Sequence, residues 1–395
     1  MNQRLTVCHT LDSAEREDSG TSAAVGGLCR AQAALGMEVD LMTLTETGGS
    51  YGRVAQDGYR LLRYPPDLMG LPSLYKLGRS RALRKALRDV RPDIFHTHNL
   101  WRMLNVYPAA AAHRVKKPFV LSPHGAVGKE SLAFSNRGKK IFWALWQKRA
   151  AHAADCLVAT AQSEYEDIRA MGLTQPVAMI SLGVEIPDLA QLPPCQTPKQ
   201  DSRPFALSLS RVHQVKGLDR LVAAWAQIAQ EFPDWHLRIV GPNENNCAEE
   251  LGEQIAQANL KDVISIEGAL QGNDKKHALM RQAHLFVLPT RHENFGVTIG
   301  EALSVGTPVI TTKAAPWPGI VDNDCGWWIG HSVEELAQTL RLAMAKPAEE
   351  LRRLGANGRQ WMQRDFGWES IALKTQELYQ WLLAKGKERP AFVID

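Results

Sequence analysis

Glu293 and Glu301 are two carboxylates that lie eight residues apart, in the run ENFGVTIGE. The apolar run at 285–288 before them predicts a strand, and the helical spacing of 297–304 predicts a helix. In a parallel α/β sheet, a loop between such elements lies at the carboxyl end of the strand, where ligands bind, and the free amides of a helix start attract phosphate. Because carboxylates repel phosphate, we expect both to accept hydrogen bonds from sugar or ribose hydroxyls of a phosphorylated ligand.

Arg211 and Lys216 form a second group, in the run SRVHQVKGL at 210–218. They follow a predicted strand and precede a predicted helix. A forked guanidinium and a point ammonium at such a loop can share a diphosphate. The alternative is two solvated loop cations, but the Glu293 loop of the same predicted sheet favours a ligand site.

Two turns of the N-terminal half carry weaker signals. Gly20, in the run DSGTS before an Ala-rich helix that ends at Gly36, would let the backbone approach a phosphate, with Ser or Thr as a helix cap; a plain strand-to-helix turn fits equally well. His124, in SPHG, closes the strand predicted at 119–123 and projects from its end, where it could bond a sugar or its phosphate. A turn histidine bonded to its own backbone is the alternative.

Metal sites and disulfides are not expected. His96 and His98 alternate along a predicted strand and are interpreted as facing opposite sides of it, so that they would not bind one metal ion together. One is expected to line a ligand cleft and the other to be buried packing. The six cysteines include no CxxC pair, and no histidine cluster has zinc spacing, so neither a disulfide nor a structural zinc is predicted.

The elements that must position these residues alternate between short β-like runs and helical patterns in both halves of the chain. This alternation predicts βαβ units and parallel sheets, hence an α/β protein with two Rossmann-like doubly wound domains. Residues 187–204 contain five prolines and read as a linker. We expect domains at 1–186 and 205–365, with ligands in the cleft between them.

Length and composition agree with this organisation. The 395 residues suit two domains, and 45% are hydrophobic. No apolar run is long enough for a membrane span or a signal peptide, which predicts a cytoplasmic protein. The net charge is only +4, but residues 73–91 hold seven Lys/Arg against one Asp, and 129–149 hold six against one Glu beside two tryptophans. These segments predict peripheral contact with an anionic membrane, each cation contributing about 1 kcal/mol; a solvated helix face is the alternative.

Together, the Arg/Lys loop, the paired glutamates, the glycine turn and the Ser-Pro-His-Gly turn closely resemble those of the retaining glycosyltransferases of family 4, which have the GT-B architecture of two facing Rossmann-like domains. The resemblance spans nearly the whole chain. The Pro316-Trp317 and Gly326-Trp327-Trp328 runs look like those of bacterial lipopolysaccharide and surface-polysaccharide transferases. The family resemblance implies that the first domain binds the acceptor and that the second domain binds the nucleotide sugar. It also implies that the last helix, within 366–395, crosses back to the first domain.

The resemblance also implies roles for single residues. Arg211 and Lys216 would bind the donor diphosphate, with Gly20 beside it. Glu293 would hold hydroxyls of the transferred sugar and Glu301 the ribose, while His124 would meet that sugar from the other domain. The backbone near Leu270 would contact the nucleotide base. The backbone of four further residues would contact the phosphate and sugar: Asn294, Phe295, Gly296 and Val297.

The implied reaction moves a sugar from a nucleotide diphosphate to an acceptor hydroxyl, with retention and without a metal, because no Asp-x-Asp site stands beside the cations. Fixed donors would then stabilise the leaving group. No cofactor beyond the donor substrate and no nucleic acid partner is expected; a lipid-linked or lipopolysaccharide glycan is the expected acceptor. A sugar-nucleotide 2-epimerase and a non-catalytic partner subunit are the alternatives. The junction reads LGVE at 182–185 where the family often has Asn-Gly-Val-Asp, so no ligand role is implied there.

Overall fold

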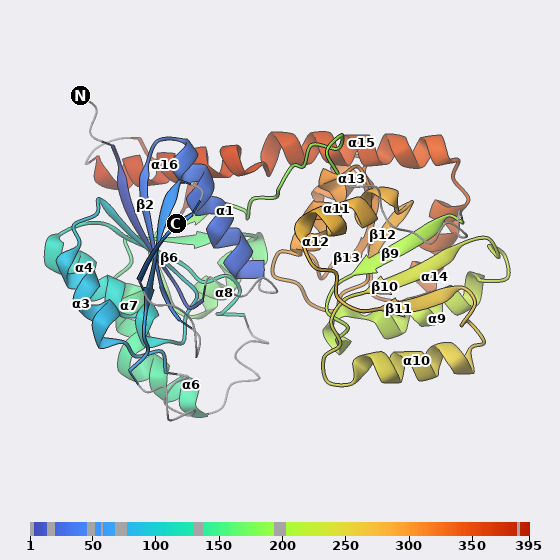
Figure 1. Ribbon diagram of the computed structural model, residues 1–395, viewed down its shortest axis with the longest axis horizontal. Helices are drawn as coiled ribbons and strands as arrows, with labels where there is room; N and C mark the ends of the chain where they lie inside the picture. Colours follow the sequence, from blue (N-terminus) through green and yellow to red (C-terminus); the bar gives the residue numbers. More distant parts are fainter. Residues whose placement is uncertain are drawn as a thin grey trace. The chain divides into compact units, whose positions relative to one another are not determined.

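The computed structural model describes residues 4–13, 20–45, 52–56, 58–67, 77–128, 137–192, 203–384 and 388–395. The chain forms two compact units: Met1–Gly183 together with Trp368–Asp395, and Val184–Gly367. Figure 1 shows that each unit is a sheet with helices on its faces. The sheets are dominated by parallel pairs, so the predicted α/β class with two doubly wound domains is confirmed.

The described part of unit 1 contains a sheet in the order β15-β8-β7-β6-β5-β1-β2-β4-β3. Its inner strands pair in parallel, whereas β3 and β15 are antiparallel to their neighbours. The sequence patterns missed both edge strands, because β15 has only two residues and β3 adds a hairpin to an otherwise βαβ chain. The strands are β1 (Thr6–Leu11), β2 (Glu38–Leu44), β3 (Gly52–Gln56), β4 (Tyr59–Tyr64), β5 (Ile94–His98), β6 (Phe119–Ser122), β7 (Cys156–Ala159), β8 (Val177–Met179) and β15 (Val393–Ile394).

Helices cover both faces of this sheet. Buried side chains of α3, α4, α7 and α8 pack with Phe95 and Phe119 on one face. On the other face, α1 and α16 pack side by side and bury Val25, Leu378 and Tyr379 (Figure 1). The helices are α1 (Gly20–Ala34), α3 (Arg81–Asp89), η1 (Met103–Asn105), α4 (Tyr107–Val115), α6 (Arg137–Phe142), the π-helix η2 (Trp143–Gln147), α7 (Lys148–His152), α8 (Gln162–Ala170) and α16 (Trp368–Leu383).

Among the described residues of the basic segment 73–91, the helix is α3, at Arg81–Asp89. It begins at Arg81, because the Ser80 hydroxyl accepts a hydrogen bond from the Leu83 amide and caps it. Residues 73–76 and 129–136 of the two basic segments lie outside the described residues. No helix in the described ranges combines the length and hydropathy of a membrane span.

Trp368 fixes the start of α16 against the rest of unit 1. A Cβ atom added at Gly27 would lie 2.3 Å from the ring, and one added at Gly183 would lie 2.2 Å from it. These distances are below any normal contact between heavy atoms, so the ring fits only because both neighbours lack a side chain. Two glycines from separate parts of unit 1 therefore form the slot that holds the last helix.

Unit 2 has a parallel sheet in the order β11-β10-β9-β12-β13-β14 among its described residues. Ligands bind such sheets where the strand order reverses, here between β9 and β12. The strands are β9 (Phe205–Leu209), β10 (His236–Val240), β11 (Ile264–Glu267), β12 (Leu285–Leu288), β13 (Val309–Thr312) and β14 (Gly326–Ile329). The helices are η3 (Gln214–Lys216), α9 (Leu218–Ile228), α10 (Cys247–Gln257), α11 (Asn273–Gln282), α12 (Val297–Ser304), α13 (Gly319–Asp322), α14 (Val333–Met344) and α15 (Ala348–Asp365).

Candidate functional site

The loop after β9 places Lys216 at the end of a one-turn helix. His213 begins this turn by accepting a hydrogen bond from the Val215 amide at its Nδ1 atom, at 3.2 Å. Gly217 ends it with φ of 67°. A Cβ atom at Gly217 would lie 2.2 Å from the Pro289 carbonyl oxygen, so this position needs glycine for both its backbone angle and the close approach of the β12 loop.

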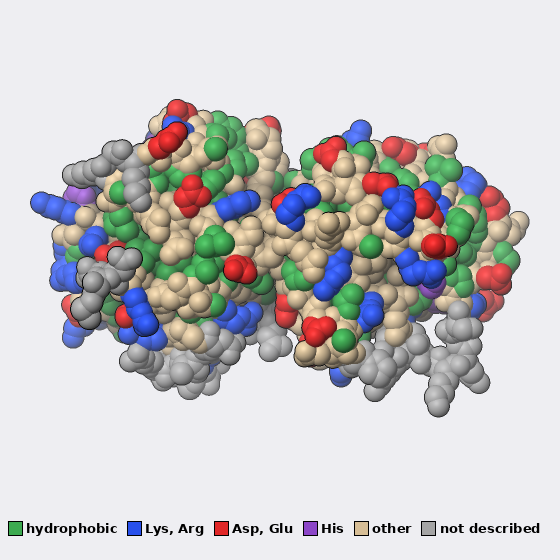
Figure 2. Space-filling model, turned by 90° about the horizontal axis from the view of Figure 1, so that it is seen from above, with side chains coloured by type: hydrophobic (Ala, Val, Ile, Leu, Met, Phe, Trp, Pro, Cys, Tyr) green, Lys and Arg blue, Asp and Glu red, His purple; other side chains and the backbone are tan. Residues whose placement is uncertain are grey.

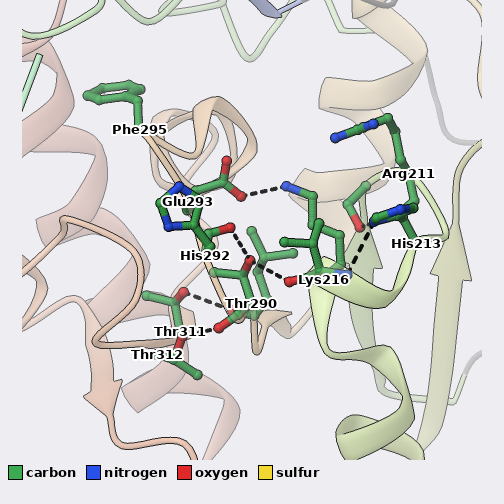
Figure 3. Close-up of polar contacts among 12 residues, drawn as sticks. Arg211, His213, Lys216, Thr290, His292, Glu293, Phe295, Thr311 and Thr312 are labelled. Carbon is green, nitrogen blue, oxygen red and sulfur yellow. Dashed lines mark hydrogen bonds and ion pairs between the residues drawn. The ribbon is translucent and has the colours of Figure 1, made fainter. Parts of the chain in front are cut away.

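Hydrogen bonds tie the β9 loop to the β12 loop (Figure 3). The Arg291 amide donates to the Val215 carbonyl at 2.7 Å, and the Thr290 hydroxyl donates to the same carbonyl at 3.1 Å. The Thr312 hydroxyl in turn donates to the Thr290 carbonyl at 2.5 Å. Two bonds thus join the loops after β9 and β12, and a third ties the β12 loop to β13, which fixes the side chains that these loops carry.

Lys216 and Glu293 meet at this junction (Figure 3). The ammonium Nζ lies 2.5 Å from the Glu293 Oε2 atom, and the two side chains are only 12% and 16% exposed. A pair so shielded from water interacts more strongly than one on the open surface. The two residues were selected from the sequence as parts of separate loops, and the structure brings them into direct contact.

Arg211 has a different partner. Its Nη1 atom lies 2.7 Å from the Glu244 Oε2 atom, and its side chain is 49% exposed. Glu244 follows β10, the neighbour of β9, and its amide donates to the Val212 carbonyl at 3.1 Å. The sequence reasoning missed Glu244 because nothing in the local pattern links a glutamate on one loop to an arginine 33 residues earlier.

Glu301 also has a lysine partner that the sequence reasoning missed. It lies inside α12, about one turn from the helix start, and its Oε1 atom is 3.8 Å from Lys276 Nζ on α11. The carboxylate is 14% exposed. Leu270 lies half-buried in the segment between β11 and α11. Each of the two glutamates therefore lies beside one ammonium group, from different elements of unit 2.

The start of α12 presents backbone amides. Gly296 occupies the cap position with φ of 81° and has no side chain that could cap the helix. Asn294 and Phe295 lead into the turn; the Phe295 ring is buried against Trp317, whose indole Nε1 donates to the Phe295 carbonyl. This packing fixes the backbone before Val297, at a helix end whose first amides attract negative charge.

In unit 1, Gly20 is the exposed first residue of α1, and Asp18 and Ser19 of the same run lie outside the described residues. Ser22 is the third residue of α1, so it does not occupy the cap position, and its hydroxyl donates to the Ser13 carbonyl at 2.7 Å. Gly20 remains compatible with a close backbone approach by a ligand.

His124 lies on a turn with φ of 51°. The buried Glu164 carboxylate holds this turn, since it accepts hydrogen bonds from the Gly125 amide at 2.6 Å and the Thr160 amide at 2.8 Å. Burial raises the pKa of Glu164. The sequence reasoning missed this residue. The His124 Nε2 atom lies 2.9 Å from Nδ1 of His98, so the ring is oriented by another side chain.

The interpretation that His96 and His98 face opposite sides of their strand is wrong. Residues two apart on a strand share a face, and the two ring centroids lie 4.3 Å apart. Both rings are buried, and nitrogen atoms of His9, His96 and His98 lie within 4.8 Å of one another. Burial lowers the pKa of His9 to about 4 and holds the pKa values of His96 and His98 well below the usual range. A cluster of neutral imidazoles therefore stands where one lining residue and one packing residue were expected.

Two protein-family models match this chain: the Glycosyl transferase 4-like domain over residues 19–183 and the Glycosyl transferases group 1 domain over residues 194–361. The MMP alpha-(1->4)-mannosyltransferase of Mycolicibacterium hassiacum is 28% identical over 244 residues, which are 60% of this chain and 57% of that protein. The chain thus spans little more than half the length of this relative.

Solved structures share the fold. The sucrose-phosphate synthase of Thermosynechococcus elongatus superposes with a TM-score of 0.71 at 21% identity, over 96% of this chain and 99% of that one. WaaG, a glycosyltransferase involved in lipopolysaccharide biosynthesis, superposes with a TM-score of 0.68 at 18% identity, over 94% and 99%. Since the family models match both units and these structures match nearly the whole length, the chain belongs to the glycosyltransferases with the GT-B fold.

Proposed function

We propose that this protein transfers a sugar from a nucleotide diphosphate sugar to a hydroxyl group of a glycan acceptor, with retention of configuration. The observation that carries the proposal is the Lys216–Glu293 pair, held at 2.5 Å where two strand ends of unit 2 meet. A cation that can bind a diphosphate thereby lies beside a carboxylate that can accept hydrogen bonds from sugar hydroxyls. A nucleotide sugar carries a diphosphate and sugar hydroxyls next to each other at the bond that breaks.

Charge stabilisation of the leaving group is assigned to Lys216, Arg211 and the α12 start. The Lys216 ammonium is the better shielded of the two cations, with 12% of its side chain exposed against 49% for Arg211. In a site closed to water, fixed donors stabilise developing charge without having to reorient. We therefore assign Lys216 to the diphosphate at the breaking bond and propose that this chemistry needs no metal ion.

Hydroxyl recognition is assigned to the two glutamates. Glu293 binds hydroxyls of the transferred sugar, and Glu301 binds the ribose. Each is held in the free protein by a lysine, at 2.5 Å for Glu293 and 3.8 Å for Glu301. These ion pairs hold both carboxylates in place within unit 2. Backbone of Asn294, Phe295, Gly296 and Val297 contacts phosphate and sugar, and backbone near Leu270 contacts the base.

Unit 1 supplies further ligand contacts. We assign to His124 a hydrogen bond with the transferred sugar, and to Gly20 a backbone approach to the diphosphate. The retention of configuration is attributed to same-face attack assisted by the departing phosphate, with Glu293 as a binding group and not as a nucleophile. These assignments follow the family resemblance and rest on the positions of both residues at turns that follow strands of the sheet.

The acceptor is proposed to be a lipid-linked or lipopolysaccharide glycan at the cytoplasmic face of a membrane. WaaG, which shares the fold, is a glycosyltransferase involved in lipopolysaccharide biosynthesis. Ile141, Leu145 and Trp146 are exposed on the segment that carries Lys139 and Lys140, which supports contact with an anionic surface. On the face drawn in Figure 2, basic and acidic side chains are intermingled. Sedimentation of the protein with liposomes that contain or lack anionic lipid tests the proposed membrane contact. Recovery of the protein in the supernatant with both kinds of liposome would refute it.

A thermal-shift panel of UDP-, GDP- and ADP-sugars tests the donor. A ligand at about 100 times its Kd stabilises the protein by about 2.7 kcal/mol, which is readily measured. Lys216→Ala is expected to abolish the shift, whereas Lys346→Ala, which removes a surface lysine 3.6 Å from Glu350 in the same unit, keeps it. Product analysis then separates transfer to an acceptor from conversion of the donor alone. Unchanged transfer by a folded Lys216→Ala protein would contradict the proposal.

A further inference from the structure

A continuous line of hydrogen bonds crosses the buried side of unit 1. It runs from Gln32 on α1 to His9 on β1, then to His98 on β5 and to His124 after β6. Gln32 Oε1 lies 2.8 Å from His9 Nε2, and His9 Nδ1 lies 2.9 Å from His98 Nε2. His98 Nδ1 lies 2.9 Å from His124 Nε2. Every distance is that of a good hydrogen bond.

This line has a direction. A neutral imidazole carries one N–H and one lone pair, so each ring that donates on one side must accept on the other. Gln32 Oε1 can only accept, which places a proton on His9 Nε2 and a lone pair on His9 Nδ1. His98 must then donate from Nε2 and accept at Nδ1, and His124 must donate from Nε2. The protons of the three rings are thus fixed by one amide oxygen.

A side branch is consistent with this orientation of the Gln32 amide. Gln32 Nε2 donates to the Tyr379 hydroxyl at 3.3 Å, and that hydroxyl, with its proton free, can donate to His96 Nδ1 at 2.6 Å. His96 can then donate from Nε2 to the Ser122 hydroxyl at 2.7 Å. Both ends of the amide are therefore used, and with the amide in this orientation the buried network has a self-consistent set of protons.

The hydrogen bonds of this cluster distinguish it from a metal site. The nitrogen atoms of His9, His96 and His98 are near enough to one another for an ion. However, all six already have a hydrogen-bond partner, and a metal would have to replace bonds of 2.6 to 2.9 Å among them. Neutral rings also suit the surroundings, because burial lowers the pKa values of His9 and His124 to about 4.

The line ends on an atom without a partner. Of the eight ring nitrogens in the four histidines, only His124 Nδ1 has no hydrogen-bond partner among the described residues, although it is buried. His124 lines a pocket within unit 1 whose other walls include Val158, Ile180, Ile371 and Trp368. A buried lone pair beside an otherwise largely apolar wall is costly until a donor reaches it.

We propose that Gln32, His9 and His98 are positioning residues that hold His124 as the Nε2–H tautomer, so that its Nδ1 atom accepts a hydrogen bond from a substrate hydroxyl. The inference deepens the proposed function and rests on it. A lone pair repels a phosphate or sulfate oxygen, which has only lone pairs to offer. The contact of His124 with the transferred sugar is therefore made to a hydroxyl group, and the diphosphate is excluded from this point.

The tautomers can be measured in the full-length protein labelled with 15N-histidine. Long-range 15N–1H correlation at pH 7 distinguishes a nitrogen that carries a proton from one that does not, and His124→Gln identifies the signals of that ring. We expect Nε2–H and an unprotonated Nδ1. Signals from a protonated Nδ1, or from an imidazolium, would overturn the proposal. Because this measurement needs no turnover, it stands even if the proposed transfer reaction is not found.

Removing the amide at the head of the line tests its positioning role. Gln32→Leu is expected to leave His124 with a mixture of both tautomers, whereas Gln162→Leu, at an exposed glutamine on α8, keeps the single form. Unchanged His124 signals in a folded Gln32→Leu protein would refute the relay. Metal analysis of the purified protein provides a second check: one bound ion per chain that is lost in His9→Gln would mean a metal site instead.

Titration separates the two ligand chemistries. Methyl α-D-glucopyranoside supplies hydroxyl donors, and sulfate supplies only acceptors. We expect the glucoside to shift the His124 Nδ1 resonance and sulfate at the same concentration to leave it in place. A shift with sulfate alone, or with neither compound, would overturn the assignment of a hydroxyl partner.

Discussion

Two neighbouring glycines of α1 should respond in opposite directions to the same substitution. Gly26 and Gly27 are consecutive residues of one helix. A Cβ atom at Gly26 would meet only the Tyr59 hydroxyl, at 3.8 Å, which is an ordinary contact. A Cβ atom at Gly27 would lie 2.3 and 2.4 Å from two ring carbons of Trp368. The gain in helix propensity is the same at both sites. The difference in free energy of unfolding between the two variants therefore measures the effect of packing against Trp368.

The magnitudes follow from these contacts. Replacing Gly with Ala inside a helix stabilises it by about 1 kcal/mol, so Gly26→Ala should raise the free energy of unfolding by up to this amount. Overpacking a filled site costs about 1–3 kcal/mol. The upper end applies to Gly27→Ala, because the Trp368 ring is blocked on its other side by Gly183 and cannot retreat. We expect a net loss of about 2 kcal/mol, or about 4–8 °C in Tm for a unit of this size.

Urea unfolding and calorimetry of the two full-length variants beside the wild type provide the measurement. Gly27→Ala should lower the midpoint of the transition in which unit 1 unfolds, and Gly26→Ala should leave it equal or higher. Equal shifts in the two variants, or a stabilised Gly27→Ala protein, would show that Trp368 is not held as the contacts indicate. Trp368→Leu in the Gly27→Ala background should recover part of the loss, because the smaller side chain leaves room for the new methyl group.

Acid should destabilise the fold through its buried histidines. Burial lowers the pKa of His9 and of His124 to about 4 in the folded chain, from about 6.5 in the unfolded chain. Their contribution to the free energy of unfolding is therefore complete above pH 6.5 and is lost as the pH falls towards 4. The loss at pH 5 is about 2 kcal/mol per histidine, seen as a falling Tm; the exposed His113→Gln should not change that slope, and a flat profile would contradict the burial argument. Glu164→Gln should cost about 1–3 kcal/mol, because the carboxylate accepts three hydrogen bonds from Gly125 and Thr160 and an amide oxygen cannot replace both of its atoms. Urea unfolding beside the exposed Glu166→Gln tests this, and equal stability of the two variants would argue against it.

Local pattern was enough to predict the elements around the unit 2 site. The apolar run before Glu293 is β12, and the helical spacing after it is α12, with bounds at Val297 and Ser304 as expected. These elements follow from periodicity over a few residues, which a single stretch of sequence contains. Features that depend on helix capping or on strand pairing were not predicted in this way. The basic helix begins later than its charges suggest because Ser80 caps it, and two short edge strands were missed.

The partners of the candidate site residues could not be predicted in this way. Lys216 meets Glu293 across 77 residues, and His9 meets His98 across 89. Such pairs form when strands that are distant in the chain become neighbours in a sheet, and no local spacing encodes which side chains will then face each other. The two histidines of β5 are a separate case, since the two-residue period of a strand predicts their shared face and was misapplied.

The sequence by itself determined that this protein has two doubly wound α/β units, and that cations and carboxylates follow strand ends of unit 2. Only the tertiary structure decided how those groups are held: a lysine beside each glutamate, a tryptophan between two glycines, and a line of imidazoles that ends at His124. The reason is physical. Helix and strand periodicity are properties of neighbouring residues, whereas proton positions, ion pairs and close packing depend on atoms that meet only once the chain has folded.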